Sequence, residues 1–139
     1  MAHLSLPALG LSLTVLAAPV LHAQEAAEGS KRMKATMLLG GEIYASAKAG
    51  ATDMTAPLLE MPPDWENVGE IEDLSLTADG RIEGVVADIG GFLGIGETRV
   101  LVPLSDLRVV QVSGDTYFLT GMTQEQMEAL QQVDEDFWQ

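Results

Sequence analysis

Short apolar runs separated by glycine-containing turns constrain this chain most, because they leave little room for long helices. The clearest turn is Ala78-Asp79-Gly80, which lies between two predicted strands at residues 68–77 and 81–89. Asp-Gly pairs favour tight hairpins, since Gly80 can take the positive φ that such turns need. A second turn at residues 113–115 separates the runs at 109–110 and 117–119. The pattern predicts an all-β barrel or sandwich of five or six short strands.

Within the first of these strands the apolar phase slips between Ile71 and Leu74. A strand alternates with a period of two residues, so the slip predicts a β-bulge or bend. Closed small barrels need such bends. In the next strand Val85, Ala87 and Ile89 share one face, which we expect to be the core face.

Three further elements complete the prediction. Residues 42–45 are expected to form a short strand after a turn at Gly40-Gly41, and Val100, Val102 and Leu104 alternate in another strand. Near the C-terminus, Thr123 and Gln126 have the spacing of a capping box, which predicts one helix over residues 124–132.

The stretch 45–67 is low in periodicity and contains glycine and three prolines. It is predicted to be a long surface loop. Four of its apolar residues are candidate anchors onto the domain: Leu58, Leu59, Met61 and Trp65.

The first 23 residues are predicted to be a cleaved export signal, with Ala23 as the small residue at the cut. Residues 24–34 are then a flexible polar leader, and the mature protein is exported to the periplasm. The region before the apolar run contains no Lys or Arg, and an apolar run of about twenty residues can also span a bilayer. An uncleaved membrane anchor therefore stands as the alternative.

Composition excludes several classes of function. The 139 residues contain no cysteine, and both histidines, His3 and His22, fall within the predicted signal. A mature chain without Cys or His has no thiolate nucleophile, no Ser–His or Cys–His pair, and no thiolate or imidazole metal site. The formal net charge of −14 also speaks against nucleic acid as a partner. We therefore expect no enzyme activity and no cofactor.

The glycine run at residues 90–96 has two interpretations. Consecutive backbone amides can bind phosphate, but no Lys-Ser/Thr pair follows the run, and the following sequence favours a strand instead of a helix. The favoured interpretation is a tight corner between two strands, where glycines supply backbone angles that a Cβ forbids. The residues assigned this structural role are Gly90, Gly91, Gly94 and Gly96, together with Asp79 and Gly80 of the hairpin turn.

Between these glycines lie three large apolar residues, Phe92, Leu93 and Ile95. They either plug the core or form an exposed apolar tip. An exposed tip would be a docking site, because contiguous exposed apolar surface usually marks an interaction.

Five carboxylates gather in the sequence around the first hairpin: Glu70, Glu72, Asp73, Asp79 and Asp88. The favoured interpretation is solvated charge, because 21 acidic residues in 139 make chance clusters common. The alternatives are a weak cation site and, less favoured, acid–base catalysis. No metal ligand and no catalytic residue is assigned.

Three separated motifs resemble the PRC-barrel domain. They are the hairpin with residues 68–74 and 79–81, the glycine run with its flanks at 85–89 and 97–104, and the helical segment 123–130. The resemblance covers residues 37–130 and departs in the loop 45–67. It implies a small PRC-type β-barrel with one C-terminal helix, which we place at residues 35–132.

The PRC-barrel family includes the barrel of the photosynthetic reaction-centre H subunit and the C-terminal domain of a ribosome maturation factor. In both settings the resemblance implies a docking module without catalytic residues. We therefore expect a non-enzymatic exported module that binds another protein or a second copy of itself. The alternative is a membrane-tethered accessory subunit related to the reaction-centre H subunit.

Residues 133–139 are predicted to be a frayed acidic tail. Its two aromatic residues, Phe137 and Trp138, are expected to dock on the domain, with docking on a partner as the alternative.

Overall fold

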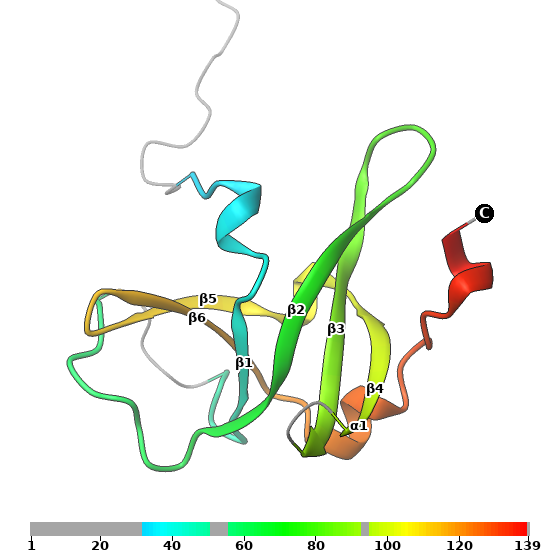
Figure 1. The fold of residues 1–139 in the computed structure, drawn as a ribbon. Helices are drawn as coiled ribbons and strands as arrows, with labels where there is room; N and C mark the ends of the chain where they lie inside the picture. Colours follow the sequence, from blue (N-terminus) through cyan, green and yellow to red (C-terminus); the bar gives the residue numbers. More distant parts are fainter. Residues whose placement is uncertain (1–31, 51–55, 93–94, 139) are drawn as a thin grey trace, which may run out of the picture. The chain divides into compact units, whose positions relative to one another are not determined.

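A curved six-stranded sheet forms the body of the protein in the computed structural model, which describes residues 32–50, 56–92 and 95–138 (Figure 1). The strands are β1 (Glu42–Ala45), β2 (Glu66–Leu76), β3 (Ile82–Phe92), β4 (Ile95–Val102), β5 (Arg108–Val112) and β6 (Asp115–Thr120). Their order is β4-β3-β2-β1-β6-β5, and every neighbouring pair is antiparallel except β1 and β6. The small all-β PRC-type fold with one C-terminal helix is therefore confirmed.

The predicted export signal and residues 24–31 of the leader lie outside the described residues. Residues 33–139 form one compact unit. Within the part of the chain that the structure describes, no helix is long and apolar enough to cross a membrane.

The β2–β3 hairpin follows the sequence prediction closely. The register of β2 against β3 shifts between Ile71 and Asp73, where the apolar phase slips in the sequence. At the turn, Gly80 has a φ of 81°, and Asp79 accepts hydrogen bonds from the side chains of Thr77 and Arg81. The turn is thus held by local side-chain contacts as well as by backbone geometry.

The sheet is not closed into a barrel, which corrects the expectation of closure. β4 and β5 are the two edge strands of the sheet. The chain leaves β4 at Pro103 and reaches β5 through a 3-10 helix, η2 (Leu104–Asp106). The prediction that Leu104 lies in a strand is therefore wrong. Non-strand segments pair with both edges: Gln132 forms an antiparallel bridge with Val100 of β4, and Leu58 forms a parallel bridge with β5. Covered edges are protected against pairing with other chains.

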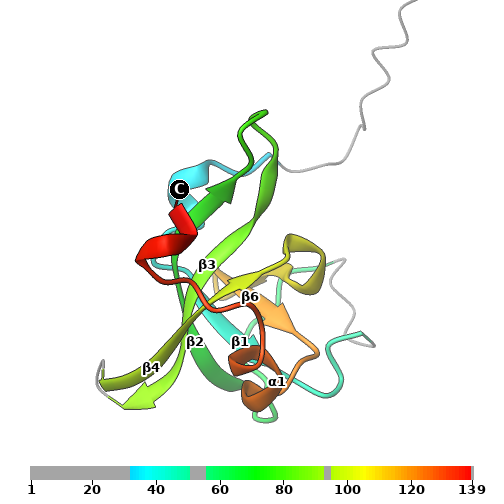
Figure 2. The same ribbon diagram turned by 90° about the vertical axis from the view of Figure 1, so that its right-hand side faces the viewer.

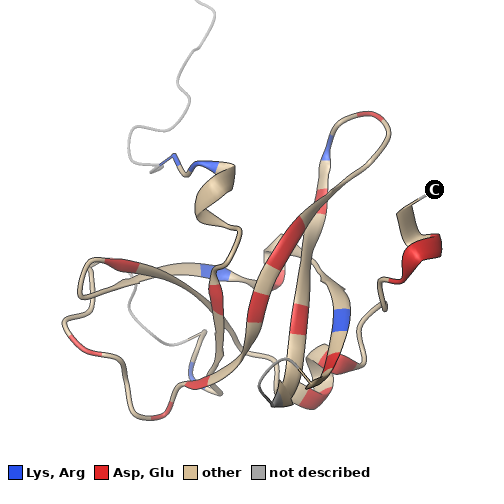
Figure 3. Cartoon of the chain, viewed as in Figure 1, with Lys and Arg blue, Asp and Glu red and all other residues tan. Residues whose placement is uncertain are grey.

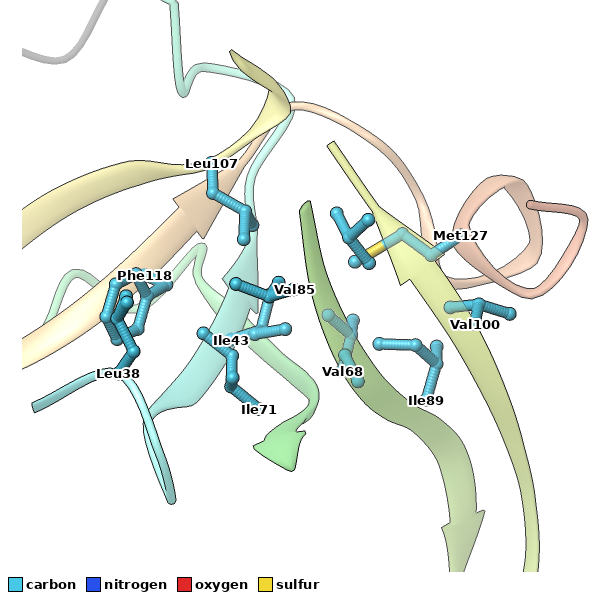
Figure 4. Packing of buried hydrophobic residues seen from close by; sticks show 12 residues of the cluster. Leu38, Ile43, Val68, Ile71, Val85, Ile89, Val100, Leu107, Phe118 and Met127 are labelled. Atoms are coloured by element: carbon cyan, nitrogen blue, oxygen red, sulfur yellow. The ribbon is translucent and has the colours of Figure 1, made fainter. Parts of the chain in front are cut away.

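The inner face of the curved sheet encloses the main core (Figure 4). Its buried residues come from five strands, from the segments beside them and from the helix: Leu38, Ile43, Val68, Ile71, Val85, Ala87, Ile89, Val100, Val102, Leu107, Phe118 and Met127. The shared inward face predicted for Val85, Ala87 and Ile89 is confirmed.

The C-terminal helix α1 (Gln124–Glu128) begins with the predicted capping box between Thr123 and Gln126. It ends four residues earlier than predicted, because the chain becomes extended and pairs with β4. Met127 of α1 is fully buried in the main core and anchors the helix there. Two other short 3-10 helices flank the domain, η1 (Ala35–Met37) and η3 (Glu135–Trp138).

The long loop partly follows its prediction. Trp65 is buried, and Leu58 and Met61 pack beside it in a second cluster against β5 and β6. Leu59 is 86% exposed and is not an anchor, which corrects that assignment. β2 begins at Glu66, just inside the segment predicted to be loop.

Candidate functional site

The glycine run lies at the end of the β3–β4 hairpin. Gly90, Gly91 and Gly96 have φ values of 73°, 76° and 79°, in the left-handed region that favours glycine. A Cβ on Gly91 would lie 2.8 Å from the carbonyl oxygen of Ile95 and 2.9 Å from the amide nitrogen of Glu97. The backbones of the two strands therefore approach closely here. Gly94 lies outside the described residues.

Of the three apolar residues that either plug the core or form a docking tip, Ile95 is the one whose side chain is described. It begins β4, opposite Phe92, and 78% of its surface is exposed. The side chain of Phe92 and the whole of Leu93 lie outside the described residues. The other large apolar residues of β4, Val100, Leu101 and Val102, are all buried.

Acidic residues form a row across the face of the sheet opposite the main core. We call this the outer face; it carries Glu42, Glu70, Val86, Asp88, Arg99 and Leu101. Along one row, Glu42 of β1 lies opposite Glu70 of β2, Glu70 opposite Asp88 of β3, and Asp88 opposite Arg99 of β4. Figure 3 shows the acidic positions on these neighbouring strands. Like charges directly opposite one another destabilise a sheet.

The five carboxylates singled out from the sequence do not form one cluster. Glu70, Glu72 and Asp88 line a single shallow groove of about 250 Å3 on the outer face. Asp79 lies instead at the turn of the β2–β3 hairpin, and the Asp73 carboxylate accepts a hydrogen bond from the amide of Leu74.

Sequence reasoning missed two further carboxylates of this groove, Glu42 and Glu97. The long loop separates β1 from β2 in the sequence, so the register that places Glu42 opposite Glu70 could not be predicted. Glu97 follows the glycine run and pairs with Gly90. Because Gly90 has no charged side chain, the sequence does not indicate that Glu97 lies beside other carboxylates. Among the described residues, no group of three or more His, Cys, Asp or Glu is arranged to hold a metal ion.

Arg99 balances one end of the acidic row. Its guanidinium donates to both oxygens of Asp88, at 2.7 Å from Nε and 2.6 Å from Nη2. The hydrogen bond with Asp88, together with the charges of Asp88, Glu72 and Glu97, raises the pKa of Arg99. Asp88 is only 13% exposed, so the bidentate pair is partly shielded from water.

A second groove, of about 440 Å3, adjoins the first through Asp88 and Glu97. β3 and β4 form one wall, and residues of the C-terminal segment (131–138) from Val133 to Trp138 form the other. Arg99, Val133, Glu135 and Trp138 contribute to its lining. The predicted frayed tail is therefore partly structured as η3, with Phe137 packed against the domain and Trp138 half exposed.

Comparison with known proteins identifies the fold family. The family model of the PRC-barrel domain matches residues 64–126, which extend from the end of the long loop into α1. The match includes the hairpin and the glycine run. No curated protein matches the chain. Residues 64–126 are thus a PRC-barrel domain.

Proposed function

We propose that this protein is a non-enzymatic, exported docking module that binds another protein, or a second copy of itself, through the tip of the β3–β4 hairpin. The observation that carries the proposal is the exposure of Ile95 at that tip. Burying an exposed isoleucine side chain contributes about 1.5 to 3 kcal/mol, so a tip of this kind favours association.

The backbone geometry beside the tip supports the same role. Gly91 allows the backbones of the two strands to approach closely, and Gly90 pairs with Glu97 across the hairpin. Ile95 pairs with Phe92, and an apolar side chain on a paired strand loses less conformational freedom on binding than one on an unpaired segment. The tip is therefore suited to recognition.

The chemistry of the chain supports a docking role over catalysis. Outside the first 22 residues the sequence contains neither Cys nor His. Within the acidic row, both carboxylate oxygens of Asp88 accept hydrogen bonds from Arg99.

The second candidate function is a membrane-tethered accessory subunit related to the reaction-centre H subunit. The apolar run at residues 4–23, with no Lys or Arg before it, favours this candidate. N-terminal sequencing of the protein from fractionated cells separates the two. A chain beginning at Gln24 in the soluble periplasmic fraction supports export, and a full-length chain in the membrane fraction supports the tether.

The docking proposal is tested by quantitative affinity capture from an extract of the host. The wild-type protein is compared with Ile95→Ser and Phe92→Ser at the tip. Leu59→Ser is the matched control, because Leu59 is equally apolar and exposed but lies on the long loop. We expect the tip variants to lose the captured proteins and the control to retain them, with melting temperatures unchanged for Ile95→Ser and Leu59→Ser. Equal capture by all variants would refute a docking role for the tip.

A further inference from the structure

Two apolar residues on the outer face are covered by the C-terminal segment. Val86 of β3 and Leu101 of β4 lie opposite one another, and both are buried although they point away from the main core. Val133 is buried against them, and Phe137 packs on the same cluster. This cluster shares no residue with the main core. The segment therefore packs on the outer face of the sheet and contributes no residue to the main core.

The segment is held in the way that a bound peptide is held at the edge of a sheet. The Leu101 amide donates to the carbonyl of Gln131 at 2.8 Å, and the Val133 amide donates to the carbonyl of Arg99 at 3.0 Å. Gln132 and Val100 form an antiparallel bridge between these two bonds. Main-chain bonds to an edge strand, together with side-chain anchors, are the usual features of peptide recognition by strand addition.

After Val133 the segment turns back toward the sheet. The Asp134 carboxylate accepts hydrogen bonds from the amides of Asp136 and Phe137, both at 3.1 Å, and so begins the single turn η3. This turn brings Phe137 back to the cluster that Val133 occupies. The two anchors are four residues apart in the sequence. Figure 2 shows the segment running past β4 and ending in η3.

The C-terminal segment carries negative charge into a groove that is itself acidic. Glu135 lines the same groove as Asp88 and Glu97, and the one cation there, Arg99, is already paired with Asp88. Like charges that line one groove repel one another and weaken an association. A segment with the same two anchors but with basic residues at positions 135 and 136 would bind this face more tightly.

The geometry points to a peptide-binding site formed by the β4 edge and the Val86–Leu101 pair, which the chain's own C-terminal segment fills. Its ligand is a segment of a partner protein that pairs with the β4 edge and then turns, with two apolar anchors four residues apart and basic side chains between them. Such a segment displaces residues 131–138 from the outer face. This inference is independent of the hairpin tip, because it concerns another surface and another mode of binding.

The first experiment releases the segment within the full chain. Val133→Ser with Phe137→Ser removes both anchors, and Trp138→Ser is the control because Trp138 is half exposed. We expect the Leu101 amide, which bonds to the segment, to exchange with solvent at least about tenfold faster in the double variant. The amides of Val100 and Val102 should change little in either variant, because β4 remains paired with β3.

The second experiment adds fluorescently labelled peptides to the released variant and measures anisotropy. One peptide has the sequence of residues 131–138, and a second contains Glu135→Lys and Asp136→Lys. A third contains Val133→Ser and Phe137→Ser as the negative control. We expect the lysine peptide to bind about tenfold tighter than the native peptide at low salt, with a smaller advantage at high salt. Wild-type protein should bind the native peptide weakly, because its own segment is present at high effective concentration.

Bound peptide should also restore slow exchange of the Leu101 amide, which places the peptide at the β4 edge. If the double variant loses its slowly exchanging core amides, Phe137→Ser alone replaces it. The site is refuted if the native and lysine peptides bind no better than the serine control. The basic character of the ligand is refuted if the lysine peptide binds no more tightly than the native one.

Discussion

Two glycines at the end of the β3–β4 hairpin share a backbone conformation but differ in their surroundings. At Gly96 a Cβ would meet nothing within 4 Å, so Gly96→Ala adds only the cost of a left-handed backbone, about 1 to 2 kcal/mol. At Gly91 the same Cβ would overlap backbone atoms of the facing strand. We therefore expect Gly91→Ala to lower the free energy of unfolding by clearly more than Gly96→Ala, as measured by denaturant titration.

Gly50 provides the control for this pair. Nothing lies within 4 Å of a Cβ there, and its φ is not in the left-handed region. Gly50→Ala should leave the free energy of unfolding nearly unchanged. If Gly91→Ala and Gly96→Ala lower the free energy of unfolding equally, the left-handed backbone conformation alone, without the close approach of the strands, explains why glycine is needed.

The acidic row makes a second prediction at the scale of single residues. Glu70 lies opposite both Glu42 and Asp88, so Glu70→Gln removes a negative charge that faces two like charges on neighbouring strands. We expect the melting temperature to rise by about 1 to 6 °C at neutral pH and low salt. Glu60→Gln, on the exposed long loop, should have no such effect. A lower melting temperature for Glu70→Gln would mean that Glu70 makes a stabilising contact.

At the scale of elements, the turn of the β2–β3 hairpin should respond to pH. Hydrogen bonds from Thr77 and Arg81 lower the pKa of Asp79 below its ordinary value of 3.8. A lowered pKa in the folded state stabilises the fold above that ordinary value, and the effect is lost as the pH falls through the lowered pKa. Asp79→Asn should therefore destabilise the protein slightly at pH 7, and the difference from wild type should disappear in strong acid. Denaturant titrations at both pH values measure it.

The hairpin elements were predictable because their signals are local. Asp79-Gly80 specifies its turn, and the apolar slip after Ile71 marks the bulge within one strand. The two sheet edges were not predictable, because Leu58 and Gln132 pair with strands far away in the sequence. The helix boundary failed for the same reason: residues 129–132 favour helix locally, but Gln131 and Gln132 pair with β4 instead.

The candidate site was predictable only in part. Alternation of residues in β3 and β4 separates inner from outer positions, so Asp88 could be placed on a face. Its contacts with Glu70 and Arg99 depend on strand register, which the sequence does not specify across a bulge and a glycine corner. Val133 packs against Val86 although the two residues are far apart in the sequence, and no local sequence pattern predicts this contact.

At the scale of the whole molecule, charge repulsion should limit stability. Nineteen acidic and four basic residues follow residue 34, and the side chains of Arg81 and Arg99 are already paired with aspartates. Raising sodium chloride from about 0.01 M to about 0.1 M shortens the screening length from about 30 Å to about 10 Å. The melting temperature should rise over this range. A constant or falling value would show that the acidic side chains are effectively independent.

The docking role itself is tested most directly by site-specific photo-crosslinking in living host cells. The photoreactive residue p-benzoylphenylalanine replaces Ile95 in one variant and the equally exposed Leu59 in another. We expect irradiation to give a discrete cross-linked product from position 95 and none from position 59, and its mass will distinguish a second copy of the chain from another protein. No product from position 95, or the same product from both positions, would contradict docking through the β3–β4 tip.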